Sequence, residues 1–325
     1  MFEKRESSIG GKTALHYFSS KLKTGLTLIP SQGANLVELH LPNAKGEVMQ
    51  VVDGISTEKE IQYDEKFKSA YLIPFPNRVR DGVYQFRGKQ YKLNCNEEAL
   101  NNAIHGIVYN MPFEVAEEDL TGDTLKVKLS LDYKGTDAGY PFPFSLLIQY
   151  TLDTTEGLTV KVDAKNTGTE ALPIGFGWHP YYKMQSPIEK CALKMPASES
   201  YNLDNRFIPN GLSVPFSKFQ VFETIGDFSI DTCFLIKQKP GRVSVYLSDP
   251  AIETTLDIWQ NNDESQLNYL VAYIPPDRES IAVEPMSCCT NAFNSGEGLV
   301  ILGSGNSTQW EFGVKTIFNA FQPIA

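Results

Sequence analysis

Residues 125–133 read LKVKLSLDY, a stretch in which apolar and polar side chains alternate over nine consecutive positions. Successive side chains of a β-strand point to opposite faces, so a period of two is typical of a strand with one buried face. The sequence therefore predicts a half-buried strand here.

The same alternation recurs through the chain, so strands dominate the secondary structure that we expect. It is found in residues 146–152, 158–162, 243–247, 256–258 and 310–314. Residues 83–93 predict a hairpin with its turn at Arg87-Gly88-Lys89. Helical periods are scarce, and only residues 58–68 indicate a short helix.

The arrangement of these segments indicates the class of fold. Short strands that are not separated by helices are typical of stacked antiparallel sheets. The 24 glycines and 19 prolines are spread along the chain as turn residues and mark no linker. We therefore expect an all-β fold with few short helices, built as a single domain over residues 1–325.

Charge limits the classes of partner. The formal net charge is −10 and the sequence pI is about 5.0, so the average surface repels a phosphate-rich polymer. We expect no nucleic acid partner and favour a small neutral or cationic molecule. The first residues carry mixed charge, and no run of 18 apolar residues occurs. We therefore expect neither a secretory signal nor a membrane span.

Cysteine usage bears on the compartment. The chain has five cysteines, an odd number without repeated spacing, which predicts free thiols in the cytoplasm rather than a disulfide framework. The neighbours Cys288 and Cys289 are expected on opposite faces of a strand. The sequence leaves the oligomeric state open.

His179 lies in the segment GFGWHPYY at residues 175–182. Pro180 favours an extended backbone at His179, because a proline excludes the α region for the residue before it. Gly175 and Gly177 allow another group to come close. The aromatic residues of this segment either stack on the C–H faces of a small polyol ring or pack in the core. This context makes His179 a candidate for acid–base chemistry.

Glu284 follows the apolar run Ile281–Val283 and precedes Pro285, a local design similar to that of His179. A glutamate at the end of a buried strand is desolvated, which raises its pKa towards values useful for a general base. The alternative is a residue at a strand edge whose carboxylate reaches water. The sequence leaves both interpretations open.

Three further residues are candidates for binding. Arg78 lies in the segment FPNRVRDG at residues 75–82, which we expect to be a loop leading into the hairpin. Its guanidinium presents five donors in a fixed geometry that suits hydroxyl groups. Asp231 lies between apolar neighbours and either accepts hydrogen bonds from vicinal hydroxyls or is an ordinary surface carboxylate. His105 precedes Gly106 in a second histidine segment.

Motifs of other chemistries are missing from the sequence. There is no P-loop, no strand–GxGxxG–helix, no GxSxG elbow and no HExxH. His105, His179 and Glu284 have the composition of a two-histidine, one-carboxylate metal site. Nothing else in the sequence supports a metal ion, and we expect none.

These segments together resemble the aldose 1-epimerase (galactose mutarotase) family over residues 77–314. Each segment alone is short, and their order and spacing carry the resemblance. The matching segments are Asn77-Arg78-Val79, the hairpin Gly82–Leu93, His105-Gly106, His179-Pro180-Tyr181-Tyr182, Asp231-Thr232-Cys233-Phe234 and Glu284-Pro285.

The resemblance implies a β-supersandwich of two large, mostly antiparallel sheets that binds a sugar. The implied reaction interconverts the α and β anomers of a hexose and needs no cofactor. Glu284 would be the general base at the anomeric hydroxyl, and His179 the general acid at the ring oxygen. His105 would help to hold the ring oxygen or a neighbouring hydroxyl, while Arg78 and Asp231 would orient the sugar.

Two departures from the well-known galactose mutarotases leave the substrate open. Ile107 stands where they have a second glycine, and HPYY at residues 179–182 stands where they usually have His-Thr-Tyr-Phe. The His-Pro form is similar to a branch that includes hexose-6-phosphate epimerases, which would need a cationic pocket from Arg78 with Arg80 or Lys183. A sugar-binding module without turnover and a metal-dependent lyase or hydrolase are further alternatives.

The implied roles set an expectation for ionisation. The free enzyme should need ionised Glu284 and protonated His179, a state that peaks below neutrality at unperturbed pKa values of about 4.3 and about 6.5. A nearby carboxylate or acceptor should raise the pKa of the imidazole. We therefore expect a bell-shaped dependence of rate on pH.

Overall fold

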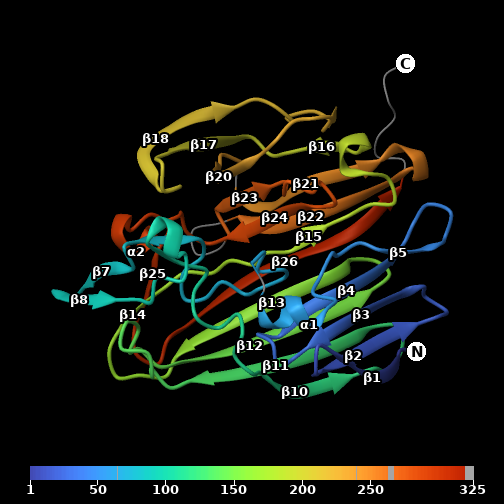
Figure 1. Cartoon of the computed structure of the whole chain (residues 1–325). Helices are drawn as coiled ribbons and strands as arrows, with labels where there is room; N and C mark the ends of the chain where they lie inside the picture. Colours follow the sequence, from blue (N-terminus) through green and yellow to red (C-terminus); the bar gives the residue numbers. More distant parts are fainter. Residues whose placement is uncertain (64, 239, 263–266, 319–325) are drawn as a thin grey trace.

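Long strands make up most of the molecule, and both α-helices are short (Figure 1). The computed structural model describes residues 1–63, 65–238, 240–262 and 267–318. The strands form three large sheets and three two-stranded ones.

The largest sheet has nine antiparallel strands. In spatial order they are β10 (Glu114–Asp119), β11 (Leu125–Tyr133), β12 (Phe144–Asp153), β13 (Gly157–Asn166), β26 (Ser307–Phe318), β22 (Thr254–Asn262), β21 (Gly241–Asp249), β16 (Ala192–Lys194) and β19 (Glu223–Thr224). The strand from the chain's C-terminal part, β26, thus lies at the centre of the sheet.

Two further sheets form a second layer. The five-stranded sheet has β1 (Glu3–Ile9), β2 (Lys12–Ser19), β3 (Thr24–Ile29), β4 (Asn35–Pro42) and β5 (Val48–Gln50) in this order. The six-stranded sheet has β15 (Tyr181–Tyr182), β24 (Ile281–Met286), β23 (Tyr269–Tyr273), β20 (Asp231–Ile236), β17 (Ser198–Leu203) and β18 (Pro209–Phe216). An antiparallel bridge between Val52 and Tyr182 connects them, so they continue one another.

Short elements complete the described chain. The two-stranded sheets pair β6 (Arg78–Arg80) with β9 (Asn102–Ile104), β7 (Val83–Phe86) with β8 (Lys89–Lys92), and β14 (Leu172–Ile174) with β25 (Val300–Leu302). The helices are α1 (Glu58–Gln62) and α2 (Ala292–Ser295), with 3-10 turns at Glu98–Leu100, Ile188–Lys190 and Pro250–Ile252.

The two layers pack against each other through apolar and aromatic side chains. In β11 the apolar residues Leu125, Val127 and Leu129 are buried, whereas Lys126 is exposed, as the alternation predicts. The core cluster contains residues from Phe2 to Val314. Because side chains from both layers share this cluster, it supports our proposal of one domain. The all-β sandwich of antiparallel sheets is confirmed.

Aromatic side chains mark the contact between the layers. The hydroxyl of Tyr71 donates a hydrogen bond to that of Tyr150 on β12, at 2.8 Å. The rings of Trp178 and Phe312 lie 5.0 Å apart, centroid to centroid. These contacts fix the segment around residue 178 against the nine-stranded sheet.

Three local predictions differ from the structure. The predicted helix at 58–68 is confirmed only at Glu58–Gln62, where Thr57 and Glu60 form a capping box. Arg78 begins strand β6 instead of lying in a loop. Cys288 and Cys289 follow the end of β24 and lie outside any strand, because the chain turns after Met286. The predicted hairpin is confirmed as β7 and β8.

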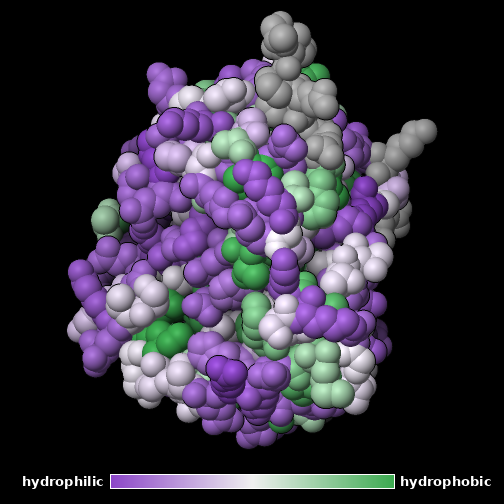
Figure 2. Space-filling model, turned by 90° about the vertical axis from the view of Figure 1, so that its right-hand side faces the viewer, coloured by the Kyte–Doolittle hydropathy of each residue, from purple (hydrophilic) through white to green (hydrophobic). Residues whose placement is uncertain are grey.

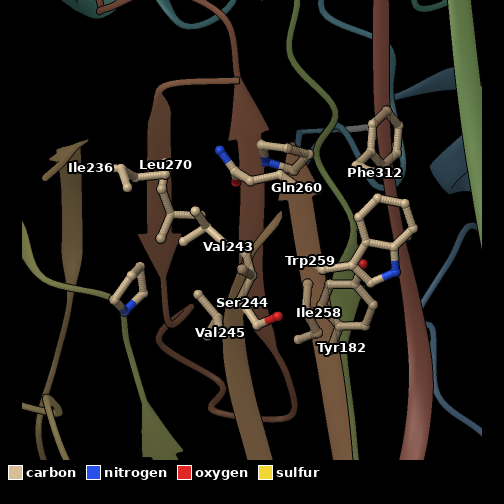
Figure 3. A pocket seen from close by; sticks show the side chains of 14 residues that line it. Tyr182, Ile236, Val243, Ser244, Val245, Ile258, Trp259, Gln260, Leu270 and Phe312 are labelled. Carbon is tan, nitrogen blue, oxygen red and sulfur yellow. The ribbon is translucent and has the colours of Figure 1, made fainter. Parts of the chain in front are cut away.

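The face of the molecule in Figure 2 is mostly hydrophilic, and the interior gap in Figure 3 is small. Figure 2 shows a face on which hydrophilic residues predominate and hydrophobic ones form small separate areas. No described helix is both long enough and apolar enough to span a membrane. The gap in Figure 3, lined by residues such as Val243, Ile258 and Phe312, holds about 10 Å³. That is room for a single water at most.

Candidate active site

Strand register brings His179 and Glu284 together across 105 residues of sequence. Tyr181 pairs with Ala282, and a bridge joins Gly177 to Met286. In an antiparallel pair the two residue numbers have a constant sum, so His179 lies opposite Glu284. The segment that contains His179 and the segment that contains Glu284, both singled out from the sequence, therefore run side by side.

The two side chains meet in a buried place. The imidazole Nε2 of His179 lies 3.4 Å from Oε1 of Glu284, with side chains only 8% and 2% exposed. Glu284 belongs to β24, which has strands on both sides, so the strand-edge alternative is wrong. Oε2 of Glu284 and Nδ1 of His179 are buried without a hydrogen-bond partner among the described residues. Unsatisfied buried polar atoms of this kind are expected where a polar ligand binds.

The residues around His179 divide between packing and the site. A Cβ on Gly175 would lie 2.4 Å from the Sγ of Cys288, so glycine allows the close approach that the sequence predicted. Of the four aromatic residues, Phe176, Trp178 and Tyr182 belong to the core cluster. Only Tyr181 lines the cavity described below, with its ring stacked on that of His179 at 4.9 Å.

A second pairing places Arg78 beside His105. Strand β6 pairs with β9 so that Arg78 faces Ile104, and the amide of His105 donates to the carbonyl of Asn77 at 3.0 Å. His105 has a positive φ of 66°, a turn conformation that sends its ring towards His179. The two imidazole rings lie 5.3 Å apart in an edge-to-face arrangement.

Asp231 and Glu284 lie on the same face of the six-stranded sheet. Cys233 on β20 pairs with Val271 on β23, and Val271 pairs with Glu284 on β24. Asp231 lies two residues before Cys233 on β20 and pairs with Tyr273. Alternate residues of a strand share a face, so Asp231 and Glu284 project to the same side. The surrounding protein raises the pKa of Asp231, and the positive charge of Arg78 opposes that shift.

All five residues singled out in the sequence line one cavity of about 680 Å³. Its other lining residues are Gln32, Asn35, Ile55, Ile61, Gln62, Tyr63, Glu65, Lys66, Phe67, Asn77, Asn96, Glu97, Ile104, Tyr109, Asn110, Tyr181, Val271 and Tyr273. The structure thus brings together chain segments from residue 32 to residue 284.

Sequence reasoning missed two kinds of cavity residue. Glu97 forms a two-pronged ion pair with Arg78, and Phe67 packs its ring on His105 at 4.6 Å. Glu97 lies in no periodic segment or motif, and Phe67 lies in the stretch 58–68, where only a short helix was expected. Their only signal is their position in turns, and the sequence contains many such turns.

Burial shifts the pKa values of the pair in opposite directions. It raises the pKa of Glu284 well above its ordinary value, aided by the charge of Asp231 and opposed by that of Arg78. It lowers the pKa of His179 to about 3. The expected rise for Glu284 is confirmed, and the expected rise for His179 is wrong.

Burial thus favours the neutral forms of both groups over the carboxylate–imidazolium pair that we expected. The neutral pair and the carboxylate–imidazolium pair contain the same number of protons, so pH does not select between them. Hydrogen bonds from a bound ligand can select between the neutral pair and the carboxylate–imidazolium pair. The one-proton state of Glu284 and His179 extends on the acid side towards pH 3, so the rate profile should be broader than unperturbed values predict.

Replacing His179 by glutamine should make unfolding less sensitive to acid. In the folded state the pKa of His179 lies below the ordinary 6.5. The contribution of neutral His179 to the free energy of unfolding is therefore complete above pH 6.5 and is lost as the pH falls towards about 3. In that window the wild type should lose up to about 1.4 kcal/mol more per pH unit than His179→Gln. Denaturant unfolding at about pH 7 and about pH 4.5 measures the difference. His16→Gln is the control, and equal losses in wild type and His179→Gln would contradict the prediction.

The histidines and carboxylates of the cavity also bear on metal binding. In the described part of the chain, no group of three or more histidine, cysteine, aspartate or glutamate residues is arranged to hold a metal ion. The rings of His105 and His179 instead meet edge to face.

The fold and site define a class of protein, the galactose mutarotase-like sandwiches. The crystal structure of a galactose mutarotase-like protein from Clostridium acetobutylicum superposes with a TM-score of 0.85 at 20% identity, covering 98% of this chain and 99% of that one. The family model described as Aldose 1-epimerase matches residues 21–315. This chain therefore belongs to the aldose 1-epimerase family.

Two curated relatives match parts of the chain at 24–29% identity. The Escherichia coli K12 protein YihR, which is uncharacterized, is 29% identical over 257 residues, covering 75% of this chain and 77% of that protein. Human galactose mutarotase is 24% identical over 191 residues, or 58% of this chain and 54% of the enzyme. The matched region thus spans about half the length of the human enzyme.

Proposed function

We propose that this protein interconverts the α and β anomers of a neutral hexose by acid–base opening of the sugar ring. Glu284 acts as the general base at the anomeric hydroxyl, and His179 as the general acid at the ring oxygen. His105 donates a hydrogen bond to the ring oxygen or its neighbour. Arg78 and Asp231 bind the hydroxyl groups of the sugar.

The observation that carries the proposal is the 3.4 Å contact between His179 and Glu284 on the wall of a sugar-sized cavity. Both oxygens of the anomeric centre are attached to one carbon. The acid and the base must therefore reach two points that are close together, which adjacent side chains on neighbouring strands can do. Positioned groups of this kind contribute roughly 10²- to 10⁴-fold each.

The proton inventory of the reaction is closed. The reaction starts from the carboxylate–imidazolium form of the pair, which hydrogen bonds of the bound sugar select. Ionised Glu284 takes the proton of the anomeric hydroxyl while the bond between C1 and the ring oxygen breaks, and protonated His179 gives a proton to the ring oxygen. The open-chain aldehyde rotates about C1–C2 and closes on its other face. The two protons then return, so Glu284 and His179 regain their starting forms without a further reactant.

The charge of the cavity favours a neutral sugar over a hexose 6-phosphate. The His179–Glu284 pair has no net charge in its one-proton state, and the other charged side chains among the described lining residues are three carboxylates and two cations: Glu65, Glu97 and Asp231, with Lys66 and Arg78. Arg80 is paired with Asp204 and, like Lys183, is not among the lining residues. A phosphate dianion would thus meet net negative charge.

The test is anomer-resolved NMR on freshly dissolved α-glucose, α-galactose and glucose 6-phosphate in dilute buffer. We expect the exchange rate of a neutral hexose to rise in proportion to protein concentration. A sample without protein measures the buffer-catalysed background, and added phosphate should not compete.

Each other outcome selects a different function. Acceleration of glucose 6-phosphate alone, with competition by inorganic phosphate, would identify a hexose-6-phosphate 1-epimerase. Saturable sugar binding without faster exchange would identify a binding module. Activity lost on treatment with a chelator would identify metal-dependent chemistry.

The same proposal includes the cytoplasm as the compartment. All five cysteines are free, and free thiols persist where the environment is reducing.

A further inference from the structure

Arg78 is held in the cavity by three different contacts. Its Nε and Nη2 donate to the carboxylate of Glu97 at 2.8–3.1 Å, and its Nη1 donates to Oδ1 of Asn77 at 3.2 Å. The ring of Phe207 covers the guanidinium at 4.9 Å. The side chains of Arg78 and Glu97 are 16% and 19% exposed, so the pair is largely shielded from water.

Glu97 is itself fixed from behind. Nδ2 of Asn102 donates to Oε2 of Glu97 at 2.8 Å, and Oδ1 of Asn102 accepts from Nη2 of Arg206 at 3.0 Å. Arg206 also donates to the carbonyls of Leu100 and Asn101, each at 2.8 Å. These bonds tie the segment that carries Phe207 to the turn that carries Glu97, so the carboxylate cannot move away from Arg78 without breaking them.

The pairing changes what Arg78 offers to a ligand. Glu97 uses one N–H of Nε and one of Nη2, which leaves N–H groups of Nη1 and Nη2 for hydroxyl oxygens. The carboxylate of Glu97 also cancels the positive charge of Arg78 at short range. An arginine with its charge cancelled still directs hydrogen bonds to a neutral sugar, but attracts a phosphate far less.

We propose that Glu97 is a specificity-determining residue, which makes the cavity select neutral sugars against sugar phosphates by neutralising Arg78. This inference rests on the proposed function for the identity of the ligand as a sugar. It goes beyond that function because it assigns the discrimination to one carboxylate. Asp231 lies within the electrostatic reach of both Arg78 and Glu97, so the three charges form one group that faces the ligand.

The test measures binding of glucose and of glucose 6-phosphate by calorimetry in wild type, Glu97→Gln and Glu98→Gln. Glu98 is the neighbouring residue and is exposed, so its variant makes the same change in total charge at a matched place. We expect Glu97→Gln to raise the affinity for glucose 6-phosphate relative to glucose by about tenfold. The affinity ratio of the two sugars in Glu98→Gln should stay within about twofold of the wild-type ratio, because solvent screens the charge of an exposed side chain.

Two results would overturn the inference. One is an unchanged affinity ratio in Glu97→Gln, and the other is an equal change in both variants, which would reflect total charge alone. Phe207→Leu separates charge from position: it should weaken glucose and glucose 6-phosphate alike. A shift of the ratio in Phe207→Leu as large as that in Glu97→Gln would also contradict the inference.

The readout distinguishes this inference from the proposed function. If both sugars bind but anomer exchange is not accelerated, the catalytic proposal fails while the affinity ratio still tests Glu97. If wild type binds neither sugar, the proposed function and this inference fail together.

Discussion

Glu284→Gln should lower kcat for anomer exchange by about 10³-fold while the protein remains folded. Glutamine has the same shape but cannot accept a proton from the anomeric hydroxyl, and that transfer belongs to the step that breaks the ring. Sugar binding should weaken little, because the amide still offers an oxygen and two donors. Anomer-resolved NMR at saturating sugar measures kcat, and calorimetry measures binding.

The same variant should be more stable than the wild type at neutral pH. The folded-state pKa of Glu284 is raised, so its favourable contribution is present below the ordinary pKa of glutamate and is lost as the pH rises. Glutamine removes this loss, so the stability difference from wild type should grow as the pH rises above the ordinary glutamate pKa of about 4.3. Glu114→Gln, on an exposed position of β10, is the control and should change neither property. An inactive variant that is also less stable at neutral pH would point to misfolding rather than to a lost base.

His179→Gln should lower kcat by about 10²- to 10³-fold, with a smaller effect on KM. The ring oxygen is a poor leaving group without a proton, and glutamine has no proton of suitable pKa to supply. The loss should be somewhat smaller than that for Glu284→Gln, because His105 lies 5.3 Å from His179, ring to ring, and can donate a hydrogen bond to the same oxygen. Burial also lowers the pKa of His105, so it offers a neutral donor in place of an acid.

The pair of histidines supplies the controls for this prediction. His105→Gln should reduce kcat less than His179→Gln, and the double variant should fall to the level of Glu284→Gln. His16→Gln, on β2 outside the cavity, should be fully active. Retention of a tenth or more of wild-type kcat by His179→Gln would show that the proton at the ring oxygen comes from elsewhere.

The alternation of apolar and polar residues, which recurs in many segments, made the fold class predictable from the sequence. The alternation in residues 125–133 places Leu125 and Val127 inside and Lys126 outside whatever the neighbours of the strand are. Burial of one face is a local requirement of each strand, so many strands together define an all-β class. The order of strands did not follow in the same way, since β26 from the end of the chain lies between β13 and β22.

The candidate site was predictable as a set of segments and not as a geometry. Pro180 and Pro285 marked the neighbourhoods of His179 and Glu284, and the resemblance to a family grouped them with Arg78. Nothing local indicates that residues 179 and 284 face each other. Glu97 had no signal beyond its position in a turn, because a carboxylate in a turn is common and only its contact with Arg78 gives it a role.

The sequence by itself determined which residues lie inside each strand and which segments carry ionisable groups near apolar runs. Those properties depend on neighbours one or two positions away. Only the tertiary structure decided the charge states, since the pKa values of Glu284 and His179 depend on water excluded by strands from distant parts of the chain. Desolvation is a property of the assembled cavity, and for that reason the neutral pair replaced the ion pair that the sequence led us to expect.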